Sequence, residues 1–133
     1  MRAILIIVVI ALLVGLGLIA FRAGDRGGVP KLVIDTPFVD FGEIPPEKTT
    51  RTIVLRNAGT GDLMVKQVTT SCNCTTAALS SDVIPPSGLT ELMITFDPEV
   101  HATEGKVMRL VWIDSNDPEA PHAEVEFRVK VVR

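Results

Sequence analysis

Two cysteines separated by one residue are the part of this sequence best suited to chemistry. Cys72 and Cys74 are the only cysteines of the chain. In an extended strand, side chains two residues apart leave the same face with Cα atoms roughly 6.5–7 Å apart, so a disulfide between them would need a local bend. Three interpretations stay open: a structural pair, a redox pair that cycles between thiols and disulfide, and a site for a soft metal ion.

The metal interpretation is incomplete on the sequence alone. Two thiolates suit Cu(I), but a lone C-x-C supplies only two of the four ligands of a usual zinc site. Met64, His101 or His122 would have to supply the others. Both histidines lie in polar surroundings, where a solvated role is more common than ligation. We therefore predict no metal site, with the cysteines as the only candidates, and no cofactor.

The polar segment SNDPEAP, which begins at Ser115, has a simpler interpretation. Asp114, Asp117 and Glu119 lie close together there, and a calcium ion could be imagined among them. Short polar side chains before a proline usually hydrogen-bond nearby backbone amides and close a turn. The turn is the preferred interpretation. The chain also lacks a glycine-rich phosphate loop, a G-x-S-x-G motif and a paired-histidine motif. We predict no catalytic residue and no enzyme.

The N-terminal segment predicts a membrane anchor. From Ala3 to Phe21 no side chain is charged or strongly polar, and at about 1.5 Å per residue this run reaches roughly the 30 Å of a bilayer's hydrocarbon core. It is longer than the apolar part of a cleaved signal peptide, and Leu18 is bulky at the position that a signal peptidase reads. We predict an uncleaved transmembrane anchor over residues 1–22 and a linker over residues 23–30. Anchor residues in contact with membrane lipid include Ala3, Leu5, Val9, Leu13, Leu16 and Phe21.

The remaining residues, 31–133, have the pattern of a single all-β domain. Alternating apolar segments are separated by glycine, proline and asparagine turns, and no helical period of ten residues occurs. The expected strands are Lys31–Thr36, Pro37–Phe41, Thr50–Arg56, Leu63–Val68, Leu89–Phe96, Val107–Ile113 and Ala123–Val132. We expect Ile84–Gly88 to be a turn, and Gly59 and Gly61 to supply positive φ. This spacing indicates an immunoglobulin-like β-sandwich of about seven strands, preceded by a single transmembrane α-helix.

Four blocks of sequence carry a family resemblance. They are FVDFGEIPPEKTTRTIVLRNAGTGDLMV, SCNCTTA, IPPSGLTELMITFDP and SNDPEAP, which begin at Phe38, Ser71, Ile84 and Ser115. Their order resembles the bacterial family called domain of unknown function 1573, which is related to major sperm protein and pilus-chaperone domains. Between the cysteines the family usually has glycine, whereas this chain has Asn73. The resemblance implies an Ig-like fold and an exported location, and it implies no reaction.

Charge and location limit the function. After Pro30 there are ten basic and fifteen acidic residues, and an acidic domain without basic clusters argues against nucleic acid as a partner. Positive charges are fewer before the anchor, at Arg2, than after it, at Arg22 and Arg26, and this distribution favours a cytoplasmic domain. Long folded domains, however, translocate largely regardless of such charges. We expect a single-pass protein of the cytoplasmic (inner) membrane with its domain in the periplasm.

The resulting hypothesis is a non-enzymatic accessory module, a structural or assembly subunit of a membrane protein complex. Other membrane protein subunits are its expected partners, and no small-molecule substrate is expected. The alternative is a thiol-redox or copper-handling protein that acts through Cys72 and Cys74.

Overall fold

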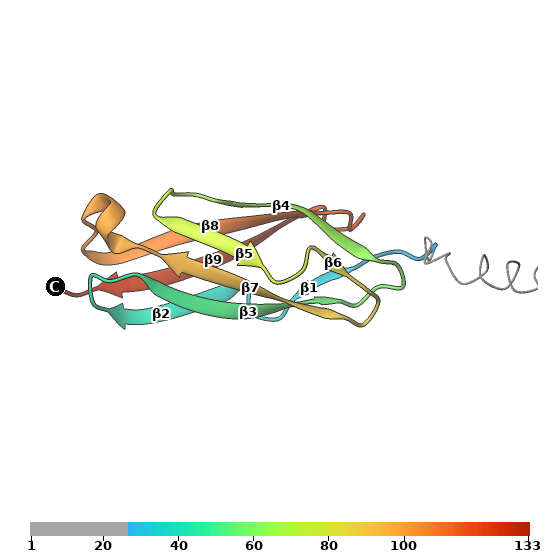
Figure 1. The fold of residues 1–133 in the computed structure, drawn as a ribbon, viewed down its shortest axis with the longest axis horizontal. Helices are drawn as coiled ribbons and strands as arrows, with labels where there is room; N and C mark the ends of the chain where they lie inside the picture. The colour runs from blue at the N-terminus through green and yellow to red at the C-terminus, as the bar shows by residue number, and fades with distance from the viewer. Residues whose placement is uncertain (1–26) are drawn as a thin grey trace, which may run out of the picture.

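Two β-sheets lie face to face in this protein (Figure 1). The computed structural model describes residues 27–133. The predicted anchor, residues 1–22, and the first half of the predicted linker, residues 23–26, lie outside the described residues. Within residues 27–133, no helix has the length and apolar character needed to cross a membrane.

One sheet has four strands in the order β1-β3-β7-β5, and the other has five in the order β2-β9-β8-β4-β6. The four-stranded sheet contains β1 (Leu32–Ile34), β3 (Thr49–Asn57), β7 (Leu89–Phe96) and β5 (Thr75–Leu79). The five-stranded sheet contains β2 (Phe38–Ile44), β9 (His122–Val131), β8 (Gly105–Ser115), β4 (Leu63–Thr70) and β6 (Val83–Ile84). A short 3₁₀ helix, η1 (Pro98–His101), follows β7. Strands β2 and β9 are parallel, and the other pairs are antiparallel.

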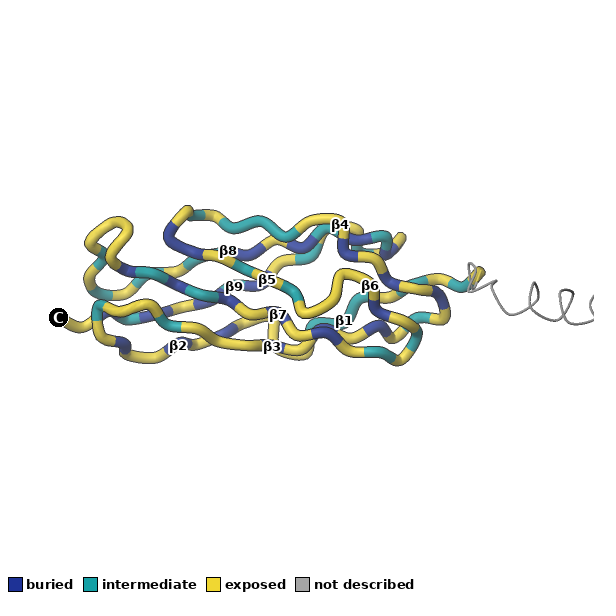
Figure 2. Tube along the Cα trace, in the orientation of Figure 1, coloured by how far each residue is buried: buried dark blue, intermediate teal, exposed yellow. Residues whose placement is uncertain are grey.

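The core lies between the sheets, where buried and exposed residues alternate along most of β3, β7 and β9 (Figure 2). Strand β9 follows the predicted alternation, with apolar side chains inward and charged ones outward. Phe127 of β9 is fully buried and stacks on Phe41 of β2 at a ring-centroid distance of 4.7 Å. It also meets the edge of Phe96 of β7 at 5.9 Å. These three rings join the two sheets at one level of the core.

The structure has nine strands among the described residues, whereas the sequence predicted about seven. The two unpredicted strands are β5 and β6. Strand β5 reads TTAAL and has small side chains, which give no clear alternation of apolar and polar residues. Strand β6 has only two residues. Ile84, which was predicted to lie in a turn, belongs to β6, is fully buried and pairs with Leu63 of β4.

The role expected of Gly59 and Gly61 was wrong. Among the described glycines only Gly42 and Gly105 have positive φ. Gly59 and Gly61 are instead required for close backbone approach. A Cβ atom on Gly59 would collide with the carbonyl oxygen of Val29, and one on Gly61 with that of Gly28. These two glycines therefore let residues 28–31 lie directly against the turn after β3.

Candidate functional site

Cys72 and Cys74 lie in the turn that joins β4 to β5, where the chain passes from one sheet to the other. A disulfide joins them, and their Cα atoms are 5.1 Å apart. This separation is shorter than the value expected for an extended strand because the chain bends at Ser71–Cys74. The bend is the local distortion that the sequence argument required for a disulfide.

Hydrogen bonds fix this turn to both sheets. The Thr70 hydroxyl lies 3.0 Å from the carbonyl oxygens of both Cys72 and Thr75, which share its single donated hydrogen. The Cys74 carbonyl accepts from the amide of Asp97, which directly follows β7 of the four-stranded sheet, at 2.8 Å. The Ser71 amide donates to the Leu110 carbonyl of β8 at 3.0 Å. The turn thus has a defined position between the sheets rather than a free loop conformation.

The two cysteines have unequal surroundings. Cys74 is buried, with 1% of its surface exposed, and belongs to the core. Cys72 is partly exposed and lines an open hollow that it shares with His101 and Arg109. The Arg109 side chain reaches the buried sulfur, with Nε donating to Cys74 Sγ at 3.5 Å. A thiol or other reagent in the hollow therefore meets Cys72 first.

Arg109 is a site residue that the sequence analysis did not single out. It occupies an inward position of β8 among apolar residues, and it is partly buried. The signal was present in the sequence, because Arg109 is the one charged residue on the inward face of Val107–Ile113. Its significance depends on Cys74, which is 35 residues away in the chain and was not predicted to lie beside it.

The additional metal ligands suggested by the sequence do not come together. His101 lies near the turn, with Nε2 at 2.7 Å from the Asn73 side-chain oxygen. His122 pairs with Asp114, and Met64 pairs with Val83, both near the opposite end of the sandwich. Among residues 27–133, no cluster of three or more histidine, cysteine, aspartate or glutamate side chains is arranged to hold a metal ion.

A second group of polar contacts lies where the chain enters the sandwich, at the other end from η1 (Figure 1). Asn57, at the end of β3, is buried, and its side chain makes four hydrogen bonds. Its Oδ1 accepts from the amides of Lys31 and Gly59, and its Nδ2 donates to the carbonyls of Gly61 and Ile84. Every polar atom of this buried amide is therefore paired.

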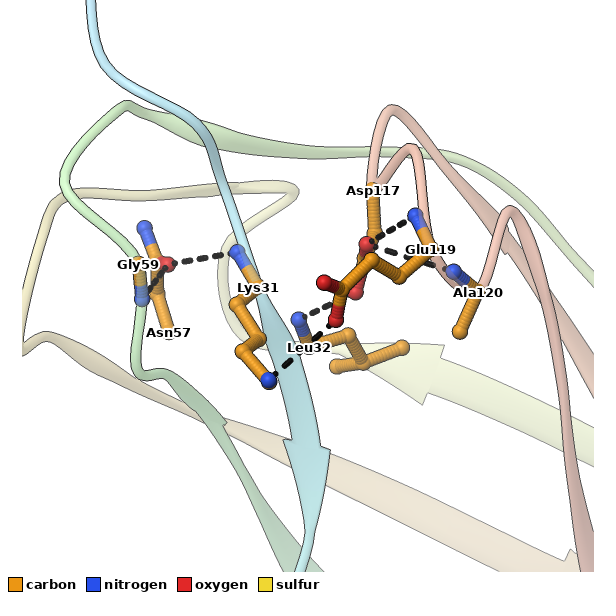
Figure 3. Close-up of polar contacts among 7 residues, drawn as sticks. All are labelled: Lys31, Leu32, Asn57, Gly59, Asp117, Glu119 and Ala120. Carbon is orange, nitrogen blue, oxygen red and sulfur yellow. Dashed lines mark hydrogen bonds and ion pairs between the residues drawn. The ribbon is translucent and has the colours of Figure 1, made fainter.

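Asp117, in the loop between β8 and β9, binds the amide of Leu32, the residue after Lys31 (Figure 3). Its carboxylate accepts from the Leu32 amide at 2.8 Å, and from the Glu119 and Ala120 amides at 2.8 and 3.2 Å. Burial by itself would raise the pKa of Asp117, but the three backbone donors, with help from Lys31, lower the pKa below its ordinary value. The predicted turn is confirmed, and the bond to Leu32 adds a link across 85 residues. We call Asn57 and Asp117 with the amides of Lys31 and Leu32 the N-terminal clamp.

The free edges of the sheets differ in how open they are. Strand β2 has a register shift between Asp40 and Glu43, and Arg51 donates to the Phe41 carbonyl at 3.1 Å, so part of this edge is distorted and covered. Strand β5 pairs only with β7 in its sheet. The Ser80 amide bonds to the Glu91 carbonyl of β7. By antiparallel alternation, the Ala77 amide then points away from β7, toward the free edge.

A family model matches most of the chain. The model for HYDIN/CFA65/VesB-like Ig-like domains matches residues 30–130. No curated protein sequence matches the chain. The match covers both sheets, the cysteine turn and the N-terminal clamp.

Solved structures show the same architecture. A protein of unknown function from Porphyromonas gingivalis W83 is 32% identical, with a TM-score of 0.70, and the match covers 83% of this chain and 50% of that one. The PapD-like domain 7 of human CEP192 is 14% identical, with a TM-score of 0.62, covering 77% and 86%. The E. coli chaperone DraB is 11% identical, with a TM-score of 0.55, covering 76% and 55%. This chain thus spans half the length of the P. gingivalis protein, and the fold is Ig-like and similar to PapD-like domains.

Proposed function

Because the chain belongs to the HYDIN/CFA65/VesB-like family of Ig-like domains, we propose that it is a non-enzymatic binding module, tethered to a membrane and part of a membrane protein complex. The finer resemblance, to domain of unknown function 1573, rests on the four sequence blocks and belongs to this proposal. We also propose that the chain is a single-pass protein of the inner membrane with its domain in the periplasm. This location is supported by the apolar run 3–21 and by the resemblance.

The free edge of β5 is the observation that carries this proposal. An exposed edge strand can pair with an extended segment of another protein, because its unpaired amides and carbonyls bind a further strand. Strand β5 has five residues and no proline. The Thr75 amide and carbonyl are already bonded to Cys72 and Thr70, so Ala77 and Leu79 supply the groups that face the free edge. The proposed partner is an extended segment of another subunit of the membrane complex.

The N-terminal clamp supports a tethered role. Two buried side chains, Asn57 and Asp117, come from different sheets and hold the amides of Lys31 and Leu32. Residues 28–31 also lie against the turn at Gly59 and Gly61. These contacts fix residues 28–32 against the domain, where the predicted linker ends. The predicted anchor would add contacts with other membrane helices, to which Gly15 and Gly17 offer small side chains.

Purification of the full chain from its native membrane in a gentle detergent tests this function. We expect specific membrane proteins to co-purify with it. Ala77→Pro removes the amide that faces the free edge without removing a bond to β7, and should reduce the recovered partner at least about tenfold. Ala77→Ser keeps the amide and is the matched control. Recovery of the wild-type chain only as a monomer would contradict the proposal.

A further inference from the structure

We propose that the Cys72–Cys74 disulfide exchanges with thiols in one direction: the incoming thiolate attacks Cys72, and Cys74 leaves as a thiolate beside Arg109. This inference goes beyond the binding function and does not depend on it. It rests on three observations: the unequal exposure of the two sulfurs, the hollow at Cys72 and the unpaired charge of Arg109 in the neighbouring strand β8.

Exposure decides which sulfur can be attacked. Cys74 is buried to 99% and lies within the core, whereas Cys72 is partly exposed in the hollow with Ser71, Asn73, His101 and Arg109. Thiol–disulfide exchange depends on access to the attacked sulfur. A thiol approaching from solvent through this hollow therefore reaches Cys72, and the same approach to Cys74 is closed by the core.

The charge of Arg109 decides which sulfur can leave. None of the ion pairs within residues 27–133 includes Arg109, although the residue is partly buried at an inward position. Its Nη1 donates to the Met108 carbonyl at 2.8 Å, and its Nε donates to Cys74 Sγ. A partly buried cation without a carboxylate partner is costly. When the disulfide opens, a Cys74 thiolate supplies the missing negative charge at hydrogen-bond distance.

A second donor prepares the attacked sulfur for its own later release. The Cys74 backbone amide donates to Cys72 Sγ at 3.1 Å. When the second thiolate breaks the mixed disulfide, this amide can stabilise the negative charge that develops on the leaving Cys72 sulfur. Each sulfur of the pair thus has one hydrogen-bond donor, the Arg109 guanidinium for Cys74 and a backbone amide for Cys72.

A dithiol supplies the two electrons that reduce the Cys72–Cys74 disulfide. Its first thiolate forms a bond to Cys72 Sγ, the Cys72–Cys74 bond breaks, and the electron pair goes to Cys74 Sγ. Its second thiolate then attacks the sulfur that is bound to Cys72, and Cys72 leaves as a thiolate. The dithiol is oxidised to a disulfide, Cys72 and Cys74 are reduced, and the two thiol protons are available to the two cysteines.

The site of first attack can be measured directly on the purified full chain in detergent micelles. The oxidised chain is treated briefly with glutathione, free thiols are blocked by alkylation, and peptide mass spectrometry locates the glutathione. We expect at least a tenfold excess on Cys72 over Cys74. An equal distribution, or an excess on Cys74, would overturn the proposal. A cysteine-containing peptide used in parallel distinguishes protein thiols from small thiols, and failure of both reagents to open the disulfide would also overturn it.

Substitution of Arg109 tests the leaving group. Arg109→Gln removes the charge and should slow the opening about tenfold, the effect of losing roughly one charge-assisted hydrogen bond. It should also lower the fraction reduced at a fixed ratio of glutathione to its disulfide. Arg109→Lys should recover part of both losses. Arg128→Gln removes an exposed arginine of β9 that pairs with Glu126, and it is the matched control.

The equilibrium measurement separates this role from a structural one. A merely structural Arg109 would leave the reduced fraction unchanged once the fold is shown to be intact by the emission of Trp112, the only tryptophan. Opening of the Arg109→Gln disulfide at the wild-type rate would overturn the role of Arg109. If Arg109→Gln does not fold, the distribution of glutathione on the wild-type chain still decides the direction of attack.

Discussion

Replacing Asp117 by asparagine tests how strongly the N-terminal clamp stabilises the domain. The carboxylate uses Oδ2 for the Leu32 amide and Oδ1 for the Glu119 and Ala120 amides. Asparagine keeps only one oxygen, so its NH₂ group must face either the Leu32 amide or the two turn amides. At least one buried donor then loses its acceptor, which costs about 1–3 kcal/mol, and the remaining bonds lose their charge. We expect Asp117→Asn to lower the free energy of unfolding by about 2–3 kcal/mol.

Urea unfolding of the full chain in detergent, followed by Trp112 emission, measures this loss. Hydrogen exchange at the Leu32 amide gives a local reading, because this amide should become less protected in the variant. Asp114→Asn is the matched control, since Asp114 pairs with a histidine whose side chain is 81% exposed and should contribute less than about 1 kcal/mol. If Asp117→Asn is as stable as Asp114→Asn, the carboxylate of the clamp does not stabilise the domain.

Two further predictions concern pH and close backbone contact. Because the folded-state pKa of Asp117 is lowered, its stabilising effect is present above the unfolded pKa and is lost as pH falls through the folded pKa. The stability difference between the wild-type chain and Asp117→Asn should therefore shrink as pH falls below the ordinary aspartate pKa of 3.8, as measured by urea midpoints, and a constant difference would contradict it. Gly61→Ala places a Cβ against the backbone of Gly28 and should cost about 2 kcal/mol or more. In Gly42→Ala the added Cβ has no atom within 4 Å, and only the positive φ of 73° is strained. This substitution should therefore lower the free energy of unfolding by about 1 kcal/mol in the same assay.

The elements with strong alternation were predictable from the sequence. Strand β9 and the inward face of β8 follow their apolar pattern because one side of each strand lies in the core. Strands β5 and β6 were not predictable in this way. Small side chains in β5 give little contrast between faces, and β6 is too short to have a period. Ile84, the large inward residue of β6, is followed by two prolines and was therefore predicted to lie in a turn.

The candidate site was predicted in its residues but not in its surroundings. The sequence placed Cys72 and Cys74 close enough to form a disulfide if the chain bends, and it placed Asp117 in a turn. It could not place Arg109 beside Cys74 or Leu32 beside Asp117, because these contacts join residues 35 and 85 positions apart. Such contacts depend on strand order and register, which local periodicity does not determine.

The distance between the N-terminal clamp and the cysteine turn makes the sandwich a spacer. The clamp lies at the level of Leu89 in β7, and Thr75, which follows the cysteines, pairs with Phe96 at the other end of that strand. Seven steps along a strand cover about 23 Å. If the proposed anchor held the clamp at a bilayer surface with the strands along the membrane normal, the sulfur pair would stand that far out in the aqueous phase. A soluble thiol would reach the pair directly there, whereas a membrane-bound thiol partner would have to extend about 23 Å to reach it.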